Sequence, residues 1–174
     1  MKKIALLFTI VMCMFAVTEA NAQKKGEMAA GTQLVYGTGD GISNFGLGAK
    51  FQWNVIDNLR LEPSFNYFFE KDMVGMWDFS ANAHYQFSLN DSFVLYPLAG
   101  ISIMGVSVDV PEINLGYGYT VGGSSASDTE VGFNIGGGAD YNITKNIAVN
   151  LEAKYKVGGE WSRFVVAAGV VYKF

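Results

Sequence analysis

Very few residues in this sequence have the chemistry of an active site. His84 is the only histidine and Cys13 the only cysteine among 174 residues. A hydrolytic centre would combine His84 with a nucleophile and an orienting group, but the spacing identifies no such partner. His84 falls in the middle of an alternating segment, on its polar side, where a polar filler is the simpler interpretation. We therefore predict that the protein is not an enzyme and has no catalytic residue, cofactor or metal site.

Two glycine-rich stretches also invite a ligand-binding interpretation. The stretch 136–138 is not followed by the Lys-Ser/Thr pair of a phosphate-binding loop, and it lies inside a strand pattern. Close backbone approach or the filling of a narrow space explains these glycines better. The stretch GTGDG at 37–41 could hold calcium weakly through Asp40, but a flexible hairpin loop is the preferred interpretation.

Six charged residues stand on the polar sides of alternating segments, and they form the main candidate site. If those sides face a common interior, the charges could gate ions or form a proton path. They could equally neutralise one another as a buried network, because an unpaired buried charge costs several kcal/mol. The structural interpretation is preferred for this set, which is Lys50, Arg60, Glu62, Asp140, Glu152 and Lys154.

The first 22 residues have the pattern of an export signal. Two lysines precede an apolar run, and TEANA supplies small residues for cleavage. The apolar run is shorter than the ~20 residues that span a bilayer as a helix. We predict a cleaved signal at 1–22 and one domain at 23–174. Cys13 would leave with the signal, so the mature domain could form no disulfide.

The composition is unusual for a soluble domain. Half of the residues are hydrophobic and only 16% are charged, with a formal net charge of −4. A soluble domain usually has about 25% charged residues. No basic stripe suited to nucleic acid is present, and beyond the signal no apolar run approaches the length of a spanning helix. Alternating strands that face lipid would account for this composition.

Alternation with a period of two is the dominant pattern of the chain. NIAVNLEAKYKV at 146–157 places an apolar residue at every second position, which indicates a strand with two different faces. Short Asn/Asp turns alternate with longer links, including the link from the third to the fourth segment. Pattern and turns together predict eight strands, at 28–37, 43–55, 59–70, 77–89, 92–107, 130–143, 147–157 and 162–174.

An eight-stranded antiparallel barrel satisfies this pattern, but its apolar side could face inward or outward. A soluble lipocalin-like carrier would turn the apolar side inward. Against that, aromatic residues of the apolar side gather near both strand ends, as in membrane belts. They are Trp53, Phe87, Phe93, Tyr141, Tyr172 and Phe174 near the short turns, and Tyr36, Tyr67, Phe69, Trp77, Phe133 and Tyr155 near the other ends. We predict an all-β, up-and-down transmembrane barrel.

The C-terminus carries a more specific pattern. The chain ends in FVVAAGVVYKF, with Val170, Tyr172 and Phe174 on one side of the last strand. This ending, with YPLAGI at 96–101 and GFNIGGGADYNIT at 132–144, resembles the small outer-membrane β-barrel family of the OmpA/OmpX-like kind, also called porin family proteins. The resemblance implies a bacterial outer-membrane location with both termini in the periplasm. It also implies contact with outer-membrane lipid and lipopolysaccharide, and insertion by periplasmic chaperones and the barrel-assembly machinery.

Some positions depart from the simple pattern. Pro63 and Pro97 lie within strands of a barrel that has no free edge, so we predict bulges or local breaks there. Several apolar residues also fall on the polar side, which predicts a partly apolar interior at Val94, Tyr96, Leu98, Met104, Val165 and Val171.

The segment 107–129 is the candidate surface-interaction site. Its alternation predicts that the fifth and sixth strands continue beyond the membrane as a protruding sheet with an exposed edge, suited to β-augmentation by an extracellular protein. A disordered low-complexity loop is the alternative. The candidate contact residues are Asp109, Glu112, Tyr117 and Tyr119.

These observations favour a structural or interactive role over catalysis. An eight-stranded barrel is filled by its own side chains, so it should not conduct like a large porin. The family resemblance implies roles in envelope integrity or adhesion. A narrow channel, or a barrel that binds lipid or another small ligand, is the alternative function.

Overall fold

The computed structural model describes residues 25–39, 42–71, 74–110, 113–114, 120–121, 124–159 and 162–174. The predicted signal at 1–22 and the residues Asp40, Glu112, Tyr117 and Tyr119 lie outside these ranges, as does the side chain of Asp109. Over the described ranges, no helix is both long enough and apolar enough to cross a membrane.

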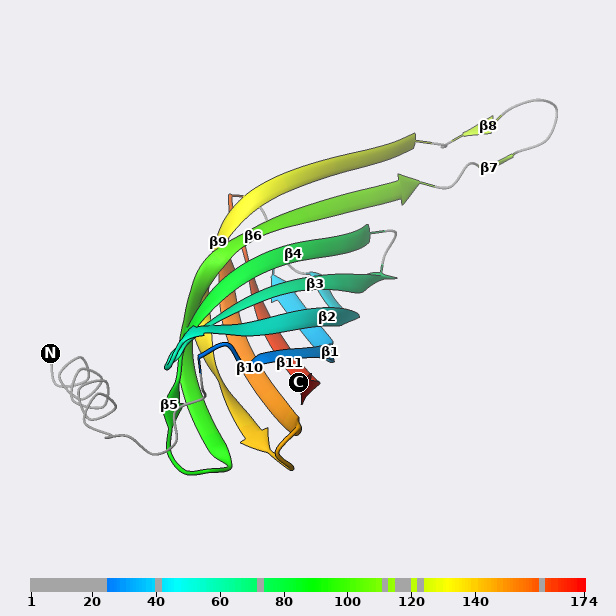
Figure 1. The fold of residues 1–174 in the computed structure, drawn as a ribbon. Coiled ribbons are helices and arrows are strands. Elements are labelled where there is room, and N and C mark those ends of the chain that lie inside the picture. The colour runs from blue at the N-terminus through cyan, green and yellow to red at the C-terminus, as the bar shows by residue number, and fades with distance from the viewer. Residues whose placement is uncertain are drawn as a thin grey trace, which may run out of the picture.

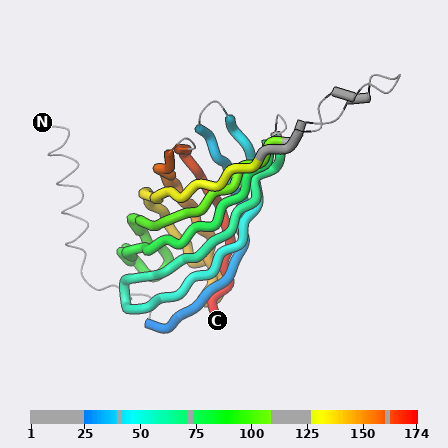
Figure 2. The backbone as a smooth tube through the Cα atoms, turned by 90° about the horizontal axis from the view of Figure 1, so that it is seen from above, coloured from blue at the N-terminus to red at the C-terminus, as the bar shows by residue number. Residues whose placement is uncertain are grey.

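Eight long antiparallel strands close into a barrel (Figure 1). The first and last strands pair with each other, and β4 pairs with β6, which completes the ring (Figure 2). The long strands are β1 (Met28–Gly39), β2 (Ile42–Ile56), β3 (Leu59–Lys71), β4 (Val74–Tyr85), β6 (Phe93–Val110), β9 (Ser124–Asn142), β10 (Ile147–Val157) and β11 (Arg163–Lys173). The predicted eight strands are confirmed, with most ends within about three residues.

Three two-residue strands complete the description. β5 (Phe87–Ser88) pairs with β6 in the register that β4 and β6 already share. β7 (Ile113–Asn114) pairs with β8 (Thr120–Val121). The predicted longer link between the third and fourth strands is wrong, because β3 continues to Lys71 and β4 begins at Val74.

The apolar side of the barrel faces outward. Leu151 is 59% exposed, whereas its neighbour Glu152 is 1% exposed. The same alternation runs along the other long strands, so polar side chains fill the interior and apolar ones cover the surface. A soluble carrier with an apolar interior would show the opposite pattern, and the prediction of a membrane-facing exterior is confirmed.

Aromatic side chains on the outer surface contact one another across strands. The rings of Tyr36 and Phe45 are 4.8 Å apart near one end of the barrel, and those of Phe51 and Phe174 are 6.4 Å apart near the other. Aromatic side chains at the two ends of a membrane barrel typically lie at the depth of the lipid headgroups.

Neither strand proline shifts the strand register. Pairing between β2 and β3 is interrupted beside Pro63 and resumes in the same register. Beside Pro97, the pairing of β6 with β4 stops and is taken up again by β5. Local breaks therefore accommodate both prolines, while the bulges lie elsewhere, at Asn54/Ile56 and Phe68/Lys71.

The interior is layered. The predicted inward apolar residues are buried, as are four that the sequence pattern did not identify, namely Val35, Phe68, Met76 and Val106. These four form an apolar cluster with Val165 and Ala167, at the end of the barrel opposite the chain termini. Ala29, Ala148 and Val171 form a smaller cluster at the terminal end. The six predicted network residues lie between the two clusters, while Lys173 lies level with Ala29 at the terminal end.

The hairpin of β6 and β9 extends past its neighbours (Figure 1). Pairing between the two strands runs without a register shift from Phe93 and Tyr141 to Val110 and Ser124. β10, by contrast, has its last pair with β9 at Val157 and Phe133. The predicted continuation of these two strands is confirmed. We call residues 107–129 the arm.

Candidate functional site in the barrel interior

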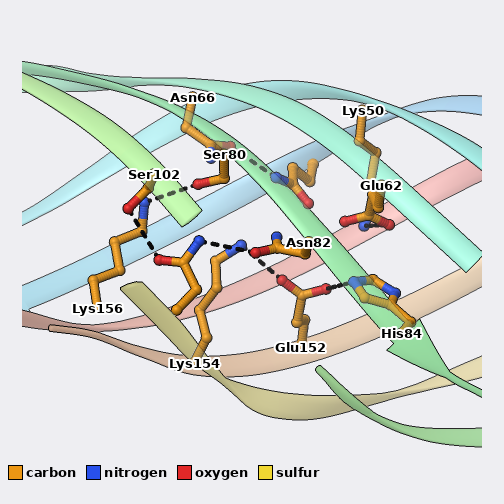
Figure 3. Close-up of polar contacts among 12 residues, drawn as sticks. Lys50, Glu62, Asn66, Ser80, Asn82, His84, Ser102, Glu152, Lys154 and Lys156 are labelled. Carbon is orange, nitrogen blue, oxygen red and sulfur yellow. Dashed lines mark hydrogen bonds and ion pairs between the residues drawn. The ribbon is translucent and has the colours of Figure 1, made fainter. Parts of the chain in front are cut away.

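The six predicted network residues all lie inside the barrel and are almost completely buried. They come from β2, β3, β9 and β10, and they form three ion pairs. Arg60 Nη1 lies 2.6 Å from Asp140 Oδ2, Lys154 Nζ lies 2.8 Å from Glu152 Oε1, and Lys50 Nζ lies 3.8 Å from Glu62 Oε2. Figure 3 shows Lys50 and Glu62 above His84, and Glu152 with Lys154 to its left.

Arg60 is the centre of this network. Its Nη1 donates to Asp140, and its Nε and Nη2 lie 3.3 Å and 3.0 Å from His84 Nδ1. The guanidinium carbon lies 4.7 Å from the centroid of the Tyr96 ring, a favourable cation–π distance. Arg60 thus joins β3 to β4, β6 and β9 across the interior.

The contacts of Arg60 determine the tautomer of His84. A guanidinium has only donors, so Nδ1 of His84 must accept, and the ring proton of the neutral imidazole is on Nε2. Nε2 faces Glu152 Oε2 at 3.9 Å. His84 is therefore part of the network, which agrees with its interpretation as an interior polar residue.

One group of interior residues has the ligand types of a metal site. It consists of Glu62, His84 and Glu152, and one potential ligand atom from each lies within 4.8 Å of the others. Two features argue against a metal here. A metal ion would bind His84 through a lone pair on Nε2, but the contacts of Arg60 with Nδ1 place the ring proton on Nε2. Lys50, Arg60 and Lys154 already neutralise the carboxylates around this point, so a divalent ion would add uncompensated charge. The cluster does not fit a metal.

A second polar layer surrounds Asp78, which the sequence-based set of six did not include. Asp78 forms an ion pair with Lys156, and its Oδ1 accepts a 2.6 Å hydrogen bond from Asn66 Nδ2. Gln33 donates to Asn66 at 2.7 Å, and Lys156 donates to Ser80 at 3.2 Å (Figure 3). Asp78 and Lys156 both stand at alternating polar positions of their strands, and this pattern in the sequence could have predicted that they face the interior.

Arg163 is the third charged interior residue that the predicted set of six did not include. Its Nη2 donates to Asn44 Oδ1 at 2.6 Å, and its guanidinium carbon lies 4.5 Å from the centroid of the Phe68 ring. It lies at the border between the charged layer and the apolar cluster of Val35, Phe68 and Met76. The stack on Phe68 lets this cation be buried against an apolar group.

Two small cavities lie at the margins of the charged layer. One, lined by Arg60, Gln52 and Lys173 among others, has a volume of about 10 Å³. The other, lined by Ser102, Glu130 and Lys156 among others, has a similar volume of about 10 Å³. Each has room for about one water molecule.

The glycines at 136–138 line this interior closely. A Cβ at Gly138 would lie 2.6 Å from the hydroxyl oxygen of Tyr96, and a Cβ at Gly136 would lie 2.2 Å from the carbonyl oxygen of Ala153. The interpretation as close backbone approach is confirmed. Gly138 makes room for the side chain of Tyr96, and Gly136 makes room for the neighbouring strand β10.

The predicted assembly residues lie on the outer surface of the last strand. Val170, Tyr172 and Phe174 are all exposed, on the lipid-facing side. The N–H of Phe174 donates to the carbonyl oxygen of Met28 at 3.0 Å, so both ends of the barrel sequence meet at one rim.

A closed antiparallel barrel with an apolar, aromatic exterior and an ion-paired interior is a transmembrane β-barrel. The family model for the outer membrane protein beta-barrel domain matches residues 5–174, so the chain belongs to that family. The protein is accordingly an outer-membrane barrel of bacteria.

Solved structures of small outer-membrane barrels show the same fold. The attachment invasion locus protein Ail of Yersinia pestis has a TM-score of 0.60 and 18% identity, covering 86% of this chain and 99% of Ail. The Neisserial surface protein A has a TM-score of 0.62 and 20% identity, covering 85% of this chain and 96% of that protein. The N-terminal barrel domain of Pseudomonas aeruginosa OprF has a TM-score of 0.61 and 18% identity, covering 87% and 100%. No curated protein sequence matches the chain.

Proposed function

We propose that the protein is a non-catalytic, non-conducting scaffold of the outer membrane that holds the arm outside the cell for contact with other surfaces. The observation that carries this proposal is the combination of an ion-paired interior with two strands that continue beyond the barrel. Two of the similar structures are named for attachment or for the cell surface, which supports an interactive role without identifying its partner.

The interior suits a plug. The carboxylates of Glu62, Asp78, Asp140 and Glu152 each face a cation, and the side chains are shielded from bulk water. Removing one partner of such a pair costs about 3–5 kcal/mol because it leaves a buried charge uncompensated. An ion crossing the barrel would have to disrupt several pairs in turn, so we expect very low conductance.

The two ends of the barrel suggest its orientation. Both Met28 and Phe174 lie at one rim, and the arm extends from the other. The outer-membrane barrels have short periplasmic turns and longer extracellular loops. We propose that the termini are periplasmic and that the arm is extracellular, above a surface of outer-membrane lipid and lipopolysaccharide.

Removal of the outer part of the arm, residues 111–123, tests this role. Val110 and Ser124 are cross-strand partners, so residues 111–123 can be replaced by an Asn-Gly turn, which closes two-residue hairpins. A matched variant replaces the same residues by a Gly/Ser stretch of equal length. Both variants should keep the heat-dependent gel shift of a folded barrel and lose attachment of intact cells to coated surfaces. Unchanged attachment in both variants would contradict the interactive role.

A narrow channel or lipid-binding barrel is the second candidate. It is favoured by the inward apolar residues Val94, Tyr96, Leu98 and Met104 of β6. Single-channel recordings and mass spectrometry of co-purified lipid distinguish the two functions. Resolved, ion-selective openings or a stoichiometric lipid would favour the second candidate over the plugged scaffold.

A further inference from the structure

The centre of the charged network contains three buried polar atoms that form no hydrogen bond within the described part of the chain. They are Glu62 Oε1, His84 Nε2 and Glu152 Oε2, and each of these residues is at most 1% exposed. The second oxygen of each carboxylate is already engaged, because Gln52 donates to Glu62 Oε2 at 2.7 Å and Lys154 donates to Glu152 Oε1 at 2.8 Å. Buried polar atoms nearly always have a partner, which is either another protein group or an ordered water molecule.

These three residues surround a common point. One carboxylate oxygen from each glutamate and one imidazole nitrogen lie within 4.8 Å of one another. For three atoms this close together, a point exists within about 2.8 Å of all of them, which is an ordinary hydrogen-bond length. His84 Nε2 and Glu152 Oε2 are 3.9 Å apart, which is too far for a direct hydrogen bond. Figure 3 shows the Glu62 carboxylate above the His84 ring and the Glu152 carboxylate to its left.

The donors and acceptors around this point select the ligand. Arg60 requires Nδ1 of His84 to accept, so the ring presents Nε2–H as a donor, while the two carboxylates present acceptors. The ligand must therefore accept one hydrogen bond and donate two, as a water molecule does. An ammonium ion has no lone pair for Nε2–H, and an anion would be repelled by both carboxylates. A buried water molecule typically makes about three hydrogen bonds to otherwise unsatisfied groups.

A small cavity at the terminal end of the barrel lies next to these residues. Its volume of about 10 Å³ has room for about one water molecule, and Gln52, Arg60 and Lys173 are among its lining residues. Gln52 donates to Glu62, and Arg60 contacts His84. Two lining residues of the cavity therefore directly contact two of the three residues around the common point, which gives water a short route to it.

We propose that one water molecule is bound between Glu62, His84 and Glu152, where it accepts from Nε2–H and donates to both carboxylates. Glu62 and His84 stand on β3 and β4, whereas Glu152 stands on β10, on the opposite side of the ring from β3. The water thus joins strands that do not pair, and it satisfies the interior without adding charge. The site goes beyond the proposed function, because it depends on neither the arm nor attachment.

Nuclear magnetic resonance tests this site through a single imidazole. His84 is the only histidine in the sequence, so isotopic labelling of the histidine nitrogens reports on this ring alone in protein purified from outer membranes without a histidine tag. We expect the ring proton on Nε2 and dipolar magnetisation transfer from water to that proton. In the rotating frame, dipolar transfer and chemical exchange have opposite signs, which separates them. A proton on Nδ1, a doubly protonated ring at neutral pH, or the absence of dipolar transfer would each overturn the proposal.

Two double variants test the position of the water. Glu152→Leu with Lys154→Met removes one acceptor together with its cation, so the net charge is unchanged, and the dipolar transfer should be lost. Asp78→Leu with Lys156→Met removes the neighbouring ion pair in the same way and should leave the transfer unchanged. Replacement of a whole buried pair by apolar residues is often tolerated, and the heat-dependent gel shift verifies folding. Unchanged transfer in the first variant, or equal loss in both, would contradict a water molecule held by Glu152.

The unmodified protein decides the proposal even where a variant does not fold, because the labelled ring and its water contact are measured in it directly. The result is also separate from the proposed function. Attachment of cells with the shortened arm tests the scaffold role alone, and the signal of the His84 ring tests the water site alone.

Discussion

The imidazole of His84 stacks on the phenol ring of Tyr96, with centroids 4.5 Å apart and planes inclined by 5°. Arg60 lies over the same Tyr96 ring and contacts His84 Nδ1 at its side. Three strands are thereby joined by one compact group of rings and a guanidinium. Because the group is buried, its polar contacts are not exchanged with bulk water, and changes to it should be felt in the stability of the whole barrel.

Arg60→Met should strongly destabilise the barrel, because it leaves Asp140 as a buried carboxylate without its 2.6 Å partner. We expect a loss of about 3–5 kcal/mol in the free energy of unfolding, measured by urea titration of the protein in lipid vesicles. The double variant with Asp140→Leu should recover much of this loss. If the loss in the double variant equals the sum of the losses in Arg60→Met and Asp140→Leu, the two residues are not coupled.

Leu151→Arg should destabilise the barrel through its outer surface. Leu151 faces lipid, and an arginine near the middle of the membrane costs about 2–4 kcal/mol. Leu151→Val is the matched control, because it keeps an apolar side chain at the same position. The measurement is the same urea titration in vesicles. A larger loss for the control than for arginine would contradict the outward orientation of this residue.

Gly105→Ala should disturb the packing between β4 and β6. A Cβ at Gly105 would lie 2.3 Å from Nε1 of the Trp77 indole, so the ring would have to move. We expect a loss of roughly 1–3 kcal/mol in unfolding free energy, typical of overpacking. In a protein that already has Trp77→Ala, Gly105→Ala should change the unfolding free energy very little, because the clash involves the Trp77 side chain.

A second glycine on the neighbouring strand provides the control for this prediction. A Cβ at Gly75 would come no closer than 3.1 Å, to Oγ of Ser107. Gly75→Ala should therefore change unfolding free energy by less than about 1 kcal/mol. If Gly105→Ala is equally mild, Trp77 does not cover Gly105 in the membrane.

Phe174→Ala should separate assembly in the cell from stability. Phe174 is 65% exposed, and its ring lies 6.4 Å from that of Phe51. Its loss should change unfolding free energy by roughly 1 kcal/mol or less, whereas the amount of folded barrel in the outer membrane should fall severalfold. Phe51→Ala removes the same ring contact without altering the terminus. Equal membrane yields for the two variants would contradict a role of the terminal residue in assembly.

The sequence by itself determined the strands and their faces. Alternation is a local property, because successive side chains of a strand point to opposite sides. Residues such as Leu151 and Glu152 were therefore assigned to opposite faces without knowledge of any partner, and the aromatic residues near the strand ends identified the apolar face as the exterior. The bounds of β10, Ile147–Val157, agree with the predicted segment for the same reason. The aromatic run at 67–69 was less informative, since three consecutive rings have no period of two, and Phe68 proved to face inward.

Only the tertiary structure decided which interior groups meet. Arg60 and Asp140 are 80 positions apart in the chain, and their contact depends on closure of the barrel and on the stagger of its strands. The same closure stacks His84 on Tyr96 and pairs Lys156 with Asp78. Alternation places a side chain on a face, but the partner across the interior is fixed by the register of all eight strands together.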